Sequence, residues 1–145
     1  MDRGPVFSQV NVVAEDFEAA VGFYRLLGLD VPEEEGDHRE VSEEGTASFE
    51  LDGLDSVRLW NASWRTADGG APVVLGFTLA SRAAVDEAYA ALTAAGHPGV
   101  QPPFDAFWGA RYAIVADPAG NQVGLMSPRD ADRQAWPPTP SPDPI

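Results

Sequence analysis

The sequence predicts an α+β fold made of two β-α-β-β-β modules that together form one structural domain. The first observation behind this prediction is an amphipathic helical pattern that occurs twice, each time after one strand-like apolar run and before further such runs. The second is a hairpin signal late in the chain, where two apolar runs flank Asp-Pro-Ala-Gly-Asn at residues 117–121. The two copies repeat a pattern rather than identical residues, at an interval of about 60 residues.

The first module is predicted over residues 1–64. Its helix is the clearest element, because Asp16 can cap the N-terminus, apolar residues recur at helical spacing, and Gly28 supplies a C-terminal stop. The predicted elements are a strand at Pro5–Val13, a helix at Asp16–Leu27, an exposed acidic strand edge with loops at Glu33–Glu44, and strands at Thr46–Leu51 and Ser56–Asn61. A turn at Asp52 and Gly53 is expected to join the last two strands.

Residues 65–72 contain Asp-Gly-Gly and a proline, and we predict that they link the two modules. The second module is predicted over residues 73–128. Its predicted elements are a strand at Val73–Leu79, a helix from the N-cap Ser81 to the stop at Gly96, and strands at Pro98–Phe104, Arg111–Ala116 and Gln122–Ser127. Residues 129–145 form a tail in which five of the last nine residues are proline, so we expect the tail to be extended.

Composition excludes several classes of function. The 145-residue chain has no cysteine, so disulfides, thiolate ligands and a cysteine nucleophile are ruled out, and a reducing cytoplasm is the expected location. Its net charge is −14, and all nine basic residues are arginine, which argues against nucleic acid as a partner. The sequence shows neither an apolar run of the roughly 20 residues that a membrane span needs nor a signal-peptide pattern. We therefore expect no membrane association.

Several local motifs resemble those of the vicinal oxygen chelate superfamily, which contains glyoxalases, extradiol dioxygenases and bleomycin-resistance proteins. The motifs are the helix entry Glu15-Asp16, the helix end Phe23–Leu29, the run Phe107–Tyr112 and the hairpin loop Asp117–Asn121. The resemblance extends from about Val6 to Pro128. It implies that each module contributes a curled mixed sheet with a helix on its outer face, and that the sheets form an open, barrel-like pocket.

The resemblance also identifies four strand positions at which the metalloenzymes of this superfamily carry their ligands. Those positions correspond to Gln9, Arg58, Val74 and Gly124 in this chain. A divalent metal needs imidazole or carboxylate donors, which these residues lack, so we expect no metal at these positions and no cofactor. The two histidines, His38 and His97, fall outside these positions and are expected in exposed turns. No catalytic residue is assigned, because the sequence shows no nucleophile–base pattern.

Strand alternation predicts which side chains face the implied pocket. The predicted ligand-binding residues are Phe7, Gln9, Asn11, Arg58, Trp60, Phe104, Phe107, Trp108 and Met126. Aromatic rings mixed with a few polar groups suit a flat, partly polar organic molecule, and the acidic charge favours a cationic one. The sequence therefore predicts a metal-free binding protein that sequesters a bulky aromatic or cationic natural product, as bleomycin-resistance proteins do.

Two alternatives remain open at this point. The chain could be an enzyme of the same superfamily, such as a lyase, an isomerase or a dioxygenase-like protein, with a non-standard site. It could also be a regulatory or assembly module that binds no ligand, although aromatic and polar groups facing the pocket argue against this. Because small two-module members of the superfamily commonly pair across subunits, we expect a homodimer in either case.

Overall fold

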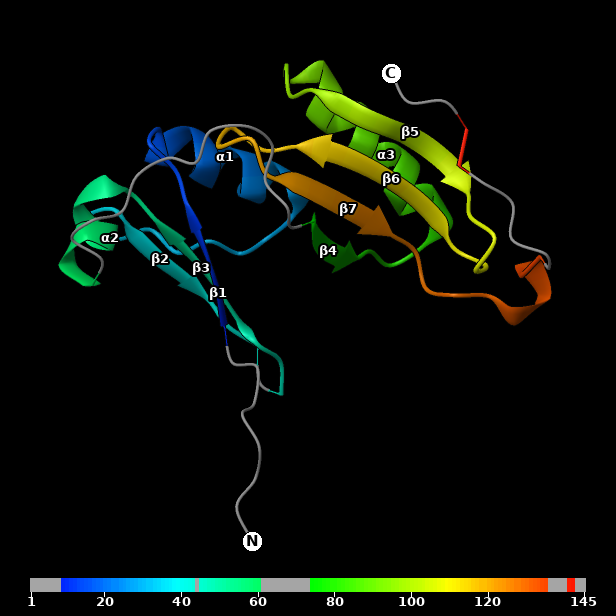
Figure 1. The fold of residues 1–145 in the computed structure, drawn as a ribbon, viewed down its shortest axis with the longest axis horizontal. Coiled ribbons are helices and arrows are strands. Elements are labelled where there is room, and N and C mark those ends of the chain that lie inside the picture. Colours follow the sequence, from blue (N-terminus) through cyan, green and yellow to red (C-terminus); the bar gives the residue numbers. More distant parts are fainter. Residues whose placement is uncertain (1–8, 44, 61–73, 136–140, 143–145) are drawn as a thin grey trace, which may run out of the picture. The chain divides into compact units, whose positions relative to one another are not determined.

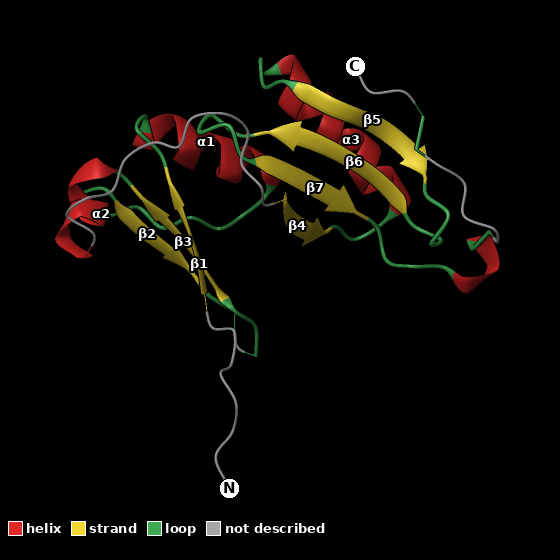
Figure 2. Cartoon of the chain, in the orientation of Figure 1, coloured by secondary structure: helices red, strands yellow, loops and turns green. Residues whose placement is uncertain are grey.

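The computed structural model describes residues 9–43, 45–60, 74–135 and 141–142, and its elements form two units divided between Thr66 and Ala67. Each unit contains one open sheet together with helices (Figures 1 and 2). The α+β class predicted from the sequence is therefore confirmed, and neither sheet closes on itself to form a barrel. The predicted linker at residues 65–72 lies outside the described residues, and the predicted domain bounds stay a prediction.

The first unit has a three-stranded sheet of order β1-β3-β2. Its elements are β1 (Gln9–Val13), α1 (Phe17–Leu27), β2 (His38–Val41), β3 (Ser48–Asp52) and α2 (Leu54–Trp60). Strand β1 runs parallel to β3, and β2 runs antiparallel to β3. As predicted, Asp16 caps α1 by accepting a hydrogen bond from the Ala19 N–H at 3.1 Å, and Gly28 ends the helix with a φ of 116° that disfavours other residues.

The two faces of the first sheet have opposite character. One face packs against α1 and is apolar, with Val12, Phe49 and Leu51 buried beside the helix residues Phe17 and Tyr24. The other face is polar, because alternate residues of the three strands point away from the helix. These polar residues are Gln9 and Asn11 of β1, His38 and Glu40 of β2, and Glu50 and Asp52 of β3. This polar face is the part of the first unit on which a site can form.

The predicted strand at Ser56–Asn61 is wrong, because residues 54–60 form the helix α2 and Asn61 lies outside the described residues. The alternation of polar and apolar residues suggested a strand, but local hydrogen bonds favour the helix. The Val57 N–H donates to the Gly53 carbonyl at 3.0 Å, and the Ser56 hydroxyl donates to the Asp52 carboxylate at 2.7 Å. In this unit β3, rather than the predicted strand, lies beside β1.

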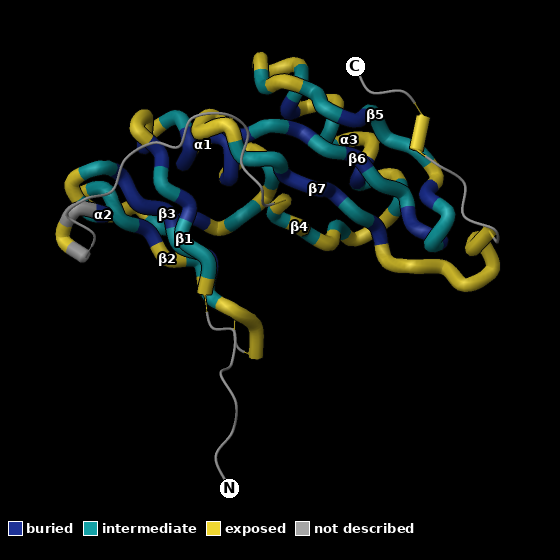
Figure 3. Tube along the Cα trace, in the orientation of Figure 1, coloured by how far each residue is buried: buried dark blue, intermediate teal, exposed yellow. Residues whose placement is uncertain are grey.

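The second unit has the predicted β-α-β-β-β arrangement. Its elements are β4 (Val74–Thr78), α3 (Arg82–Ala94), β5 (Gly99–Asp105), β6 (Arg111–Ala116) and β7 (Gln122–Met126), followed by a 3-10 turn at Ala131–Arg133. The strand order is β4-β7-β6-β5, with β4 parallel to β7 and the other pairs antiparallel. Helix α3 packs against β5, β6 and β7 on one face of this sheet, and its residues Val85 and Leu92 are fully buried. Figure 3 shows buried stretches along β6 and β7.

The hairpin between β6 and β7 forms as the sequence predicts. The buried Asp117 carboxylate accepts hydrogen bonds from the Ala119 N–H at 2.9 Å and from the Asn121 N–H at 2.8 Å. It also accepts one from the Asn121 amide group at 2.9 Å, and Gly120 takes a φ of 88°. These contacts hold β7 in register with β6, so that Tyr112 pairs with Met126 and Ile114 pairs with Gly124.

Candidate functional site

Five of the predicted ligand-binding residues line two cavities, one in each unit. Gln9 and Asn11 line a cavity on the polar face of the first sheet, which we call the polar cavity. Phe104, Phe107 and Trp108 line a cavity in the second unit, which we call the aromatic cavity. Their role in binding a ligand stays a prediction.

The polar cavity has a volume of about 350 Å³ and is built around a buried carboxylate. Its lining residues are Gln9, Asn11, His38, Glu50, Asp52, Ser56 and Leu59. Asp52 is fully buried and accepts hydrogen bonds from the Asn11 amide at 2.8 Å and from the Ser56 hydroxyl at 2.7 Å. Its carboxylate also lies 2.8 Å from His38 Nδ1. A buried charge needs such partners, so Asp52 holds the polar side chains around it in fixed positions.

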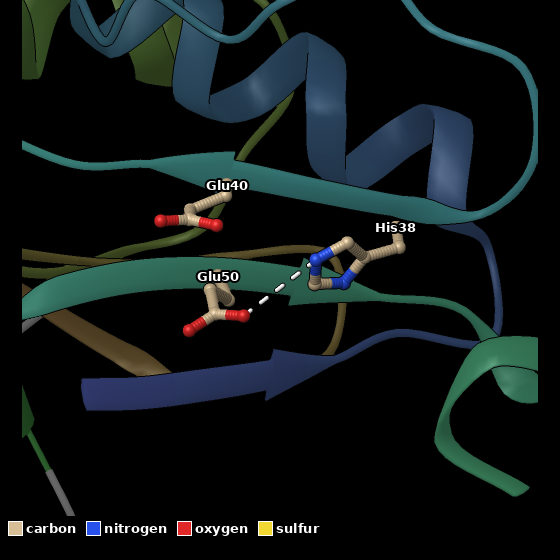
Figure 4. A group of neighbouring side chains, drawn as sticks. All are labelled: His38, Glu40 and Glu50. Carbon is tan, nitrogen blue, oxygen red and sulfur yellow. Dashed lines mark ion pairs between the residues drawn. The ribbon is translucent and has the colours of Figure 1, made fainter. Parts of the chain in front are cut away.

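His38 belongs to this cavity, and the expectation that it lies in an exposed turn is wrong. It is the first residue of β2, and pairing with Asp52 in the register of the sheet points its ring toward β3. Figure 4 shows its ring beside the carboxylates of Glu40 and Glu50, and its Nε2 lies 3.6 Å from Glu50 Oε1. The strand edge predicted within residues 33–44 is present as β2, but the acidic composition of this segment suggested that His38 lies in a loop rather than on the strand.

The aromatic cavity has a volume of about 230 Å³ and lies on the face of the second sheet opposite to α3. Its lining residues are Gln101, Phe104, Phe107, Trp108, Tyr112, Ile114 and Ser141. The Trp108 ring meets Phe107 edge-on at a centroid distance of 5.2 Å and Tyr112 at 5.4 Å. The Trp108 indole N–H donates to the Met126 sulfur at 3.3 Å. The structure thus brings four of the predicted residues together, namely Phe104, Phe107, Trp108 and Met126.

Tyr112 is the aromatic lining residue of this cavity that the sequence analysis missed, and Gln101, Ile114 and Ser141 were also not predicted. Its ring lies over Gly124, and a Cβ atom at that glycine would lie only 2.7 Å from the tyrosine hydroxyl. Burial raises the pKa of Tyr112 above its usual value. The signal available in the sequence was the alternation along β6, which places Tyr112 on the same face as Ile114.

Three predicted residues are not placed by the structure. Phe7 lies outside the described residues. Arg58 and Trp60 lie in α2, but the positions of their side chains are not among those described. Because the inward direction of Arg58 and Trp60 was deduced from strand alternation, the helix removes that argument for both residues.

Of the four residues that the resemblance places at metal-ligand positions, Gln9, Val74 and Gly124 do not fit a divalent metal. Val74 and Gly124 carry no donor atom, and Gln9 offers only an amide that is hydrogen-bonded to Asn11 at 2.8 Å. The fourth position was assigned to Arg58 as part of the predicted strand at Ser56–Asn61, and the helix α2 removes that assignment. In addition, the Tyr112 ring fills the space in which a longer side chain at position 124 would lie. We therefore derive no chemistry from a metal at these four positions.

None of the described helices is long and apolar enough to cross a membrane.

Solved structures with the same fold are numerous. A glyoxalase/bleomycin resistance protein/dioxygenase from Nocardioides is 23% identical, with 90% of this chain and 88% of that chain covered at a TM-score of 0.67. A family enzyme of the same description from Burkholderia phytofirmans is 21% identical, covering 83% and 97% of the two chains at a TM-score of 0.70. A lactoylglutathione lyase from Agrobacterium tumefaciens is 23% identical, covering 86% and 95% at a TM-score of 0.61. At these identities the likeness shows the fold.

A search of the curated proteins found no match. The family model of the Glyoxalase/Bleomycin resistance protein/Dioxygenase superfamily, in contrast, matches residues 6–125, which is most of the chain. Together with the β-α-β-β-β unit and its hairpin, this match shows that the chain belongs to the Glyoxalase/Bleomycin resistance protein/Dioxygenase superfamily.

Proposed function

We propose that this protein binds a flat aromatic small molecule and does not convert it, in the manner of the bleomycin-resistance branch of its superfamily. The observation that carries the proposal is the aromatic cavity, in which the rings of Phe104, Phe107, Trp108 and Tyr112 surround one space. Neighbouring rings in this group meet at interplanar angles of 84°, 88° and 70°. A planar ligand can therefore stack on one ring while it meets the edge of another, which is the geometry that aromatic groups prefer.

The size of the aromatic cavity limits what can enter it. At about 230 Å³ it is smaller than the roughly 300–1,000 Å³ of cavities that enclose a whole drug-sized molecule. We infer that the cavity takes the planar ring system of the ligand and that the rest of a bulky molecule stays outside. Gln101 and Ser141 are the non-aromatic polar members of the lining and can accept or donate hydrogen bonds.

The charge of the chain supports a cationic ligand. A net charge of −14 attracts cations to the protein, and this attraction weakens as salt screens it. Aromatic rings add a cation–π contribution of about 0.5–2 kcal/mol when a cation lies over a ring face. A planar cation is thus favoured both at long range and inside the cavity.

An enzymatic function is the second candidate. It is favoured by the likeness to the lactoylglutathione lyase from Agrobacterium tumefaciens and by the His38–Asp52 pair, which has the geometry of a base and its orienting carboxylate. The residues at the metal-ligand positions implied by the resemblance argue against an enzymatic function, because Gln9, Val74 and Gly124 do not provide the donor atoms that the usual metal needs. A module without a ligand would have no need of the aromatic cavity.

The proposal is tested by fluorescence titration with proflavine, a planar cation, with acridine, its uncharged parent ring system, and with bleomycin. We expect proflavine to bind more tightly than acridine and to lose affinity as salt is added. Trp108→Ala should weaken proflavine binding at least roughly tenfold, because it removes the ring that contacts both Phe107 and Tyr112. His97→Ala is the control and should leave the affinity unchanged.

Mass spectrometry after incubation separates binding from turnover. Recovery of each compound intact agrees with sequestration, whereas a converted product would favour the enzymatic candidate. Unchanged affinity in a folded Trp108→Ala variant would contradict binding in the aromatic cavity.

A further inference from the structure

We propose that His38, Glu40 and Glu50 bind a divalent transition-metal ion on the polar face of the first sheet. This site shares no residue with the lining of the aromatic cavity, and the proposal does not depend on the proposed function. It uses none of Gln9, Arg58, Val74 and Gly124, on which the expectation of a metal-free protein was based. Two of its three ligands come from β2, a strand that carries none of those four positions.

The register of the sheet brings the three side chains together. His38 and Glu40 lie two residues apart on β2 and therefore point to the same face, and Glu40 pairs directly with Glu50 of β3. Figure 4 shows the three side chains next to one another, with the carboxylates of Glu40 and Glu50 on the same side of the His38 ring. One possible ligand atom from each residue lies within 4.8 Å of the others, so small side-chain rotations bring all three to bonding distance of one ion.

Asp52 orients the His38 ring for metal binding. His38 Nδ1 lies 2.8 Å from the Asp52 carboxylate, and this hydrogen bond favours the tautomer in which Nδ1 is the donor. The lone pair is then on Nε2, the nitrogen that faces Glu50 at 3.6 Å. A carboxylate that orients a metal-binding histidine in this way is a regular feature of metal sites in proteins. Asp52 is itself held by Asn11 and Ser56, so the orientation of the ring is fixed by buried contacts.

The charge around the site also favours a cation. Arg39 lies between His38 and Glu40 in the sequence, but its side chain points to the opposite face, where its guanidinium lies 5.2 Å from the centre of the Phe17 ring. Two glutamates and a buried aspartate therefore share this face with one histidine. One imidazole and two carboxylates suit Zn²⁺, Co²⁺, Ni²⁺ or Mn²⁺, with Zn–N and Zn–O bonds of about 2.0–2.2 Å.

Three protein ligands leave at least one coordination position for water or for an oxygen of a bound molecule. The polar cavity of about 350 Å³ lies beside the site and gives access to that position. The competing arrangement is a protonated His38 that forms ion pairs with Glu50 and Asp52 and binds no metal. The two arrangements differ in whether the purified chain takes up an ion.

The test is a titration of the metal-stripped 145-residue chain with Co²⁺, followed by its visible absorption, together with native mass spectrometry in the presence of Zn²⁺. We expect one ion per chain. Glu50→Gln and His38→Ala should each weaken Co²⁺ binding at least roughly tenfold, and Asp52→Asn should weaken it by roughly 10–100-fold although this residue is not a ligand. His97→Ala is the matched histidine control and should bind Co²⁺ as the unchanged protein does.

Glu40→Gln provides a variant that keeps the fold intact, because Glu40 is exposed. It should weaken Co²⁺ binding at least roughly tenfold and leave proflavine binding unchanged, which separates this proposal from the proposed function. Absence of a 1:1 complex at about 100 μM Co²⁺ would overturn the proposal, since such a site would be too weak to matter. Binding that persists unchanged in both Glu40→Gln and Glu50→Gln would overturn it as well.

Discussion

Replacement of Gly124 by alanine tests how closely the Tyr112 ring is packed in the aromatic cavity. The added Cβ atom would lie 2.7 Å from Tyr112 Oη and 3.2 Å and 3.3 Å from two ring carbons. The ring cannot move away freely, because its neighbours Phe104 and Trp108 lie at centroid distances of 6.2 Å and 5.4 Å. The alanine therefore forces the tyrosine, and with it the ring cluster, out of its position.

Two effects of opposite sign determine how much Gly124→Ala changes the free energy of unfolding. Alanine restricts the unfolded chain more than glycine does, which stabilises the folded state by about 0.4–1 kcal/mol. Overpacking of a filled site costs about 1–3 kcal/mol. The distance of 2.7 Å between the added Cβ atom and Tyr112 Oη is shorter than an ordinary contact. We therefore expect the cost of overpacking to exceed the stabilisation, and the free energy of unfolding should fall by about 1–2 kcal/mol.

Urea denaturation followed by tryptophan fluorescence measures this change, and a double-mutant cycle with Tyr112→Phe identifies its cause. The phenylalanine lacks the hydroxyl that makes the closest approach, so Gly124→Ala should cost less than about 1 kcal/mol in that background. If Gly124→Ala costs as much with phenylalanine as with tyrosine, or if it stabilises the protein, the packing described for Tyr112 is refuted.

Three further predictions concern the hairpin, the tyrosine and the assembly. Asp117→Ala should lower the free energy of unfolding by about 2–4 kcal/mol, because three hydrogen bonds to a buried carboxylate are lost, and an unchanged urea midpoint would contradict this. Burial raises the pKa of Tyr112 in the folded protein. As the pH rises, the unfolded chain therefore loses this proton first, near pH 10. The stability associated with Tyr112 is present below that pH and is lost as the pH rises through the pKa of the folded protein. Burial raises the pKa of Tyr89 as well, so an ultraviolet absorbance titration should show more than one late-ionising tyrosine, and Tyr112→Phe should remove one of them. A late-ionising component that Tyr112→Phe leaves unchanged would argue against the burial of Tyr112. We also propose a homodimer, for which light scattering should give twice the 15.4 kDa of one chain, and a monomer at micromolar concentration would contradict it.

Local chemistry in the sequence was enough to predict most of the fold. The helices at residues 17–27 and 82–94 follow from their apolar spacing and from the caps Asp16 and Ser81. Each cap side chain accepts a hydrogen bond from the backbone N–H three residues later. The Asp117–Asn121 loop follows from residues that bond within the loop itself. The lack of donor atoms at Val74 and Gly124 is likewise a property of the residues alone. The groups that form the helix caps and the loop are close in the sequence, so the local sequence pattern is enough to predict these elements.

The elements that the sequence did not predict depend on contacts between distant segments. Residues 54–60 alternate like a strand, but in addition to the local hydrogen bonds that favour a helix, Asp37 holds its first turn. The Asp55 N–H donates to the Asp37 carboxylate at 3.0 Å, and the Gly53 N–H donates to the Asp37 carbonyl at 2.7 Å. His38 looked like a residue of an acidic loop, and only its pairing with Asp52 across two strands places it beside Glu50. Tyr112 was concealed in the same way, because its position depends on a glycine of the neighbouring strand. Composition and periodicity determine which face a residue occupies, whereas strand register decides which side chains meet, because register is set by the packing of the whole sheet.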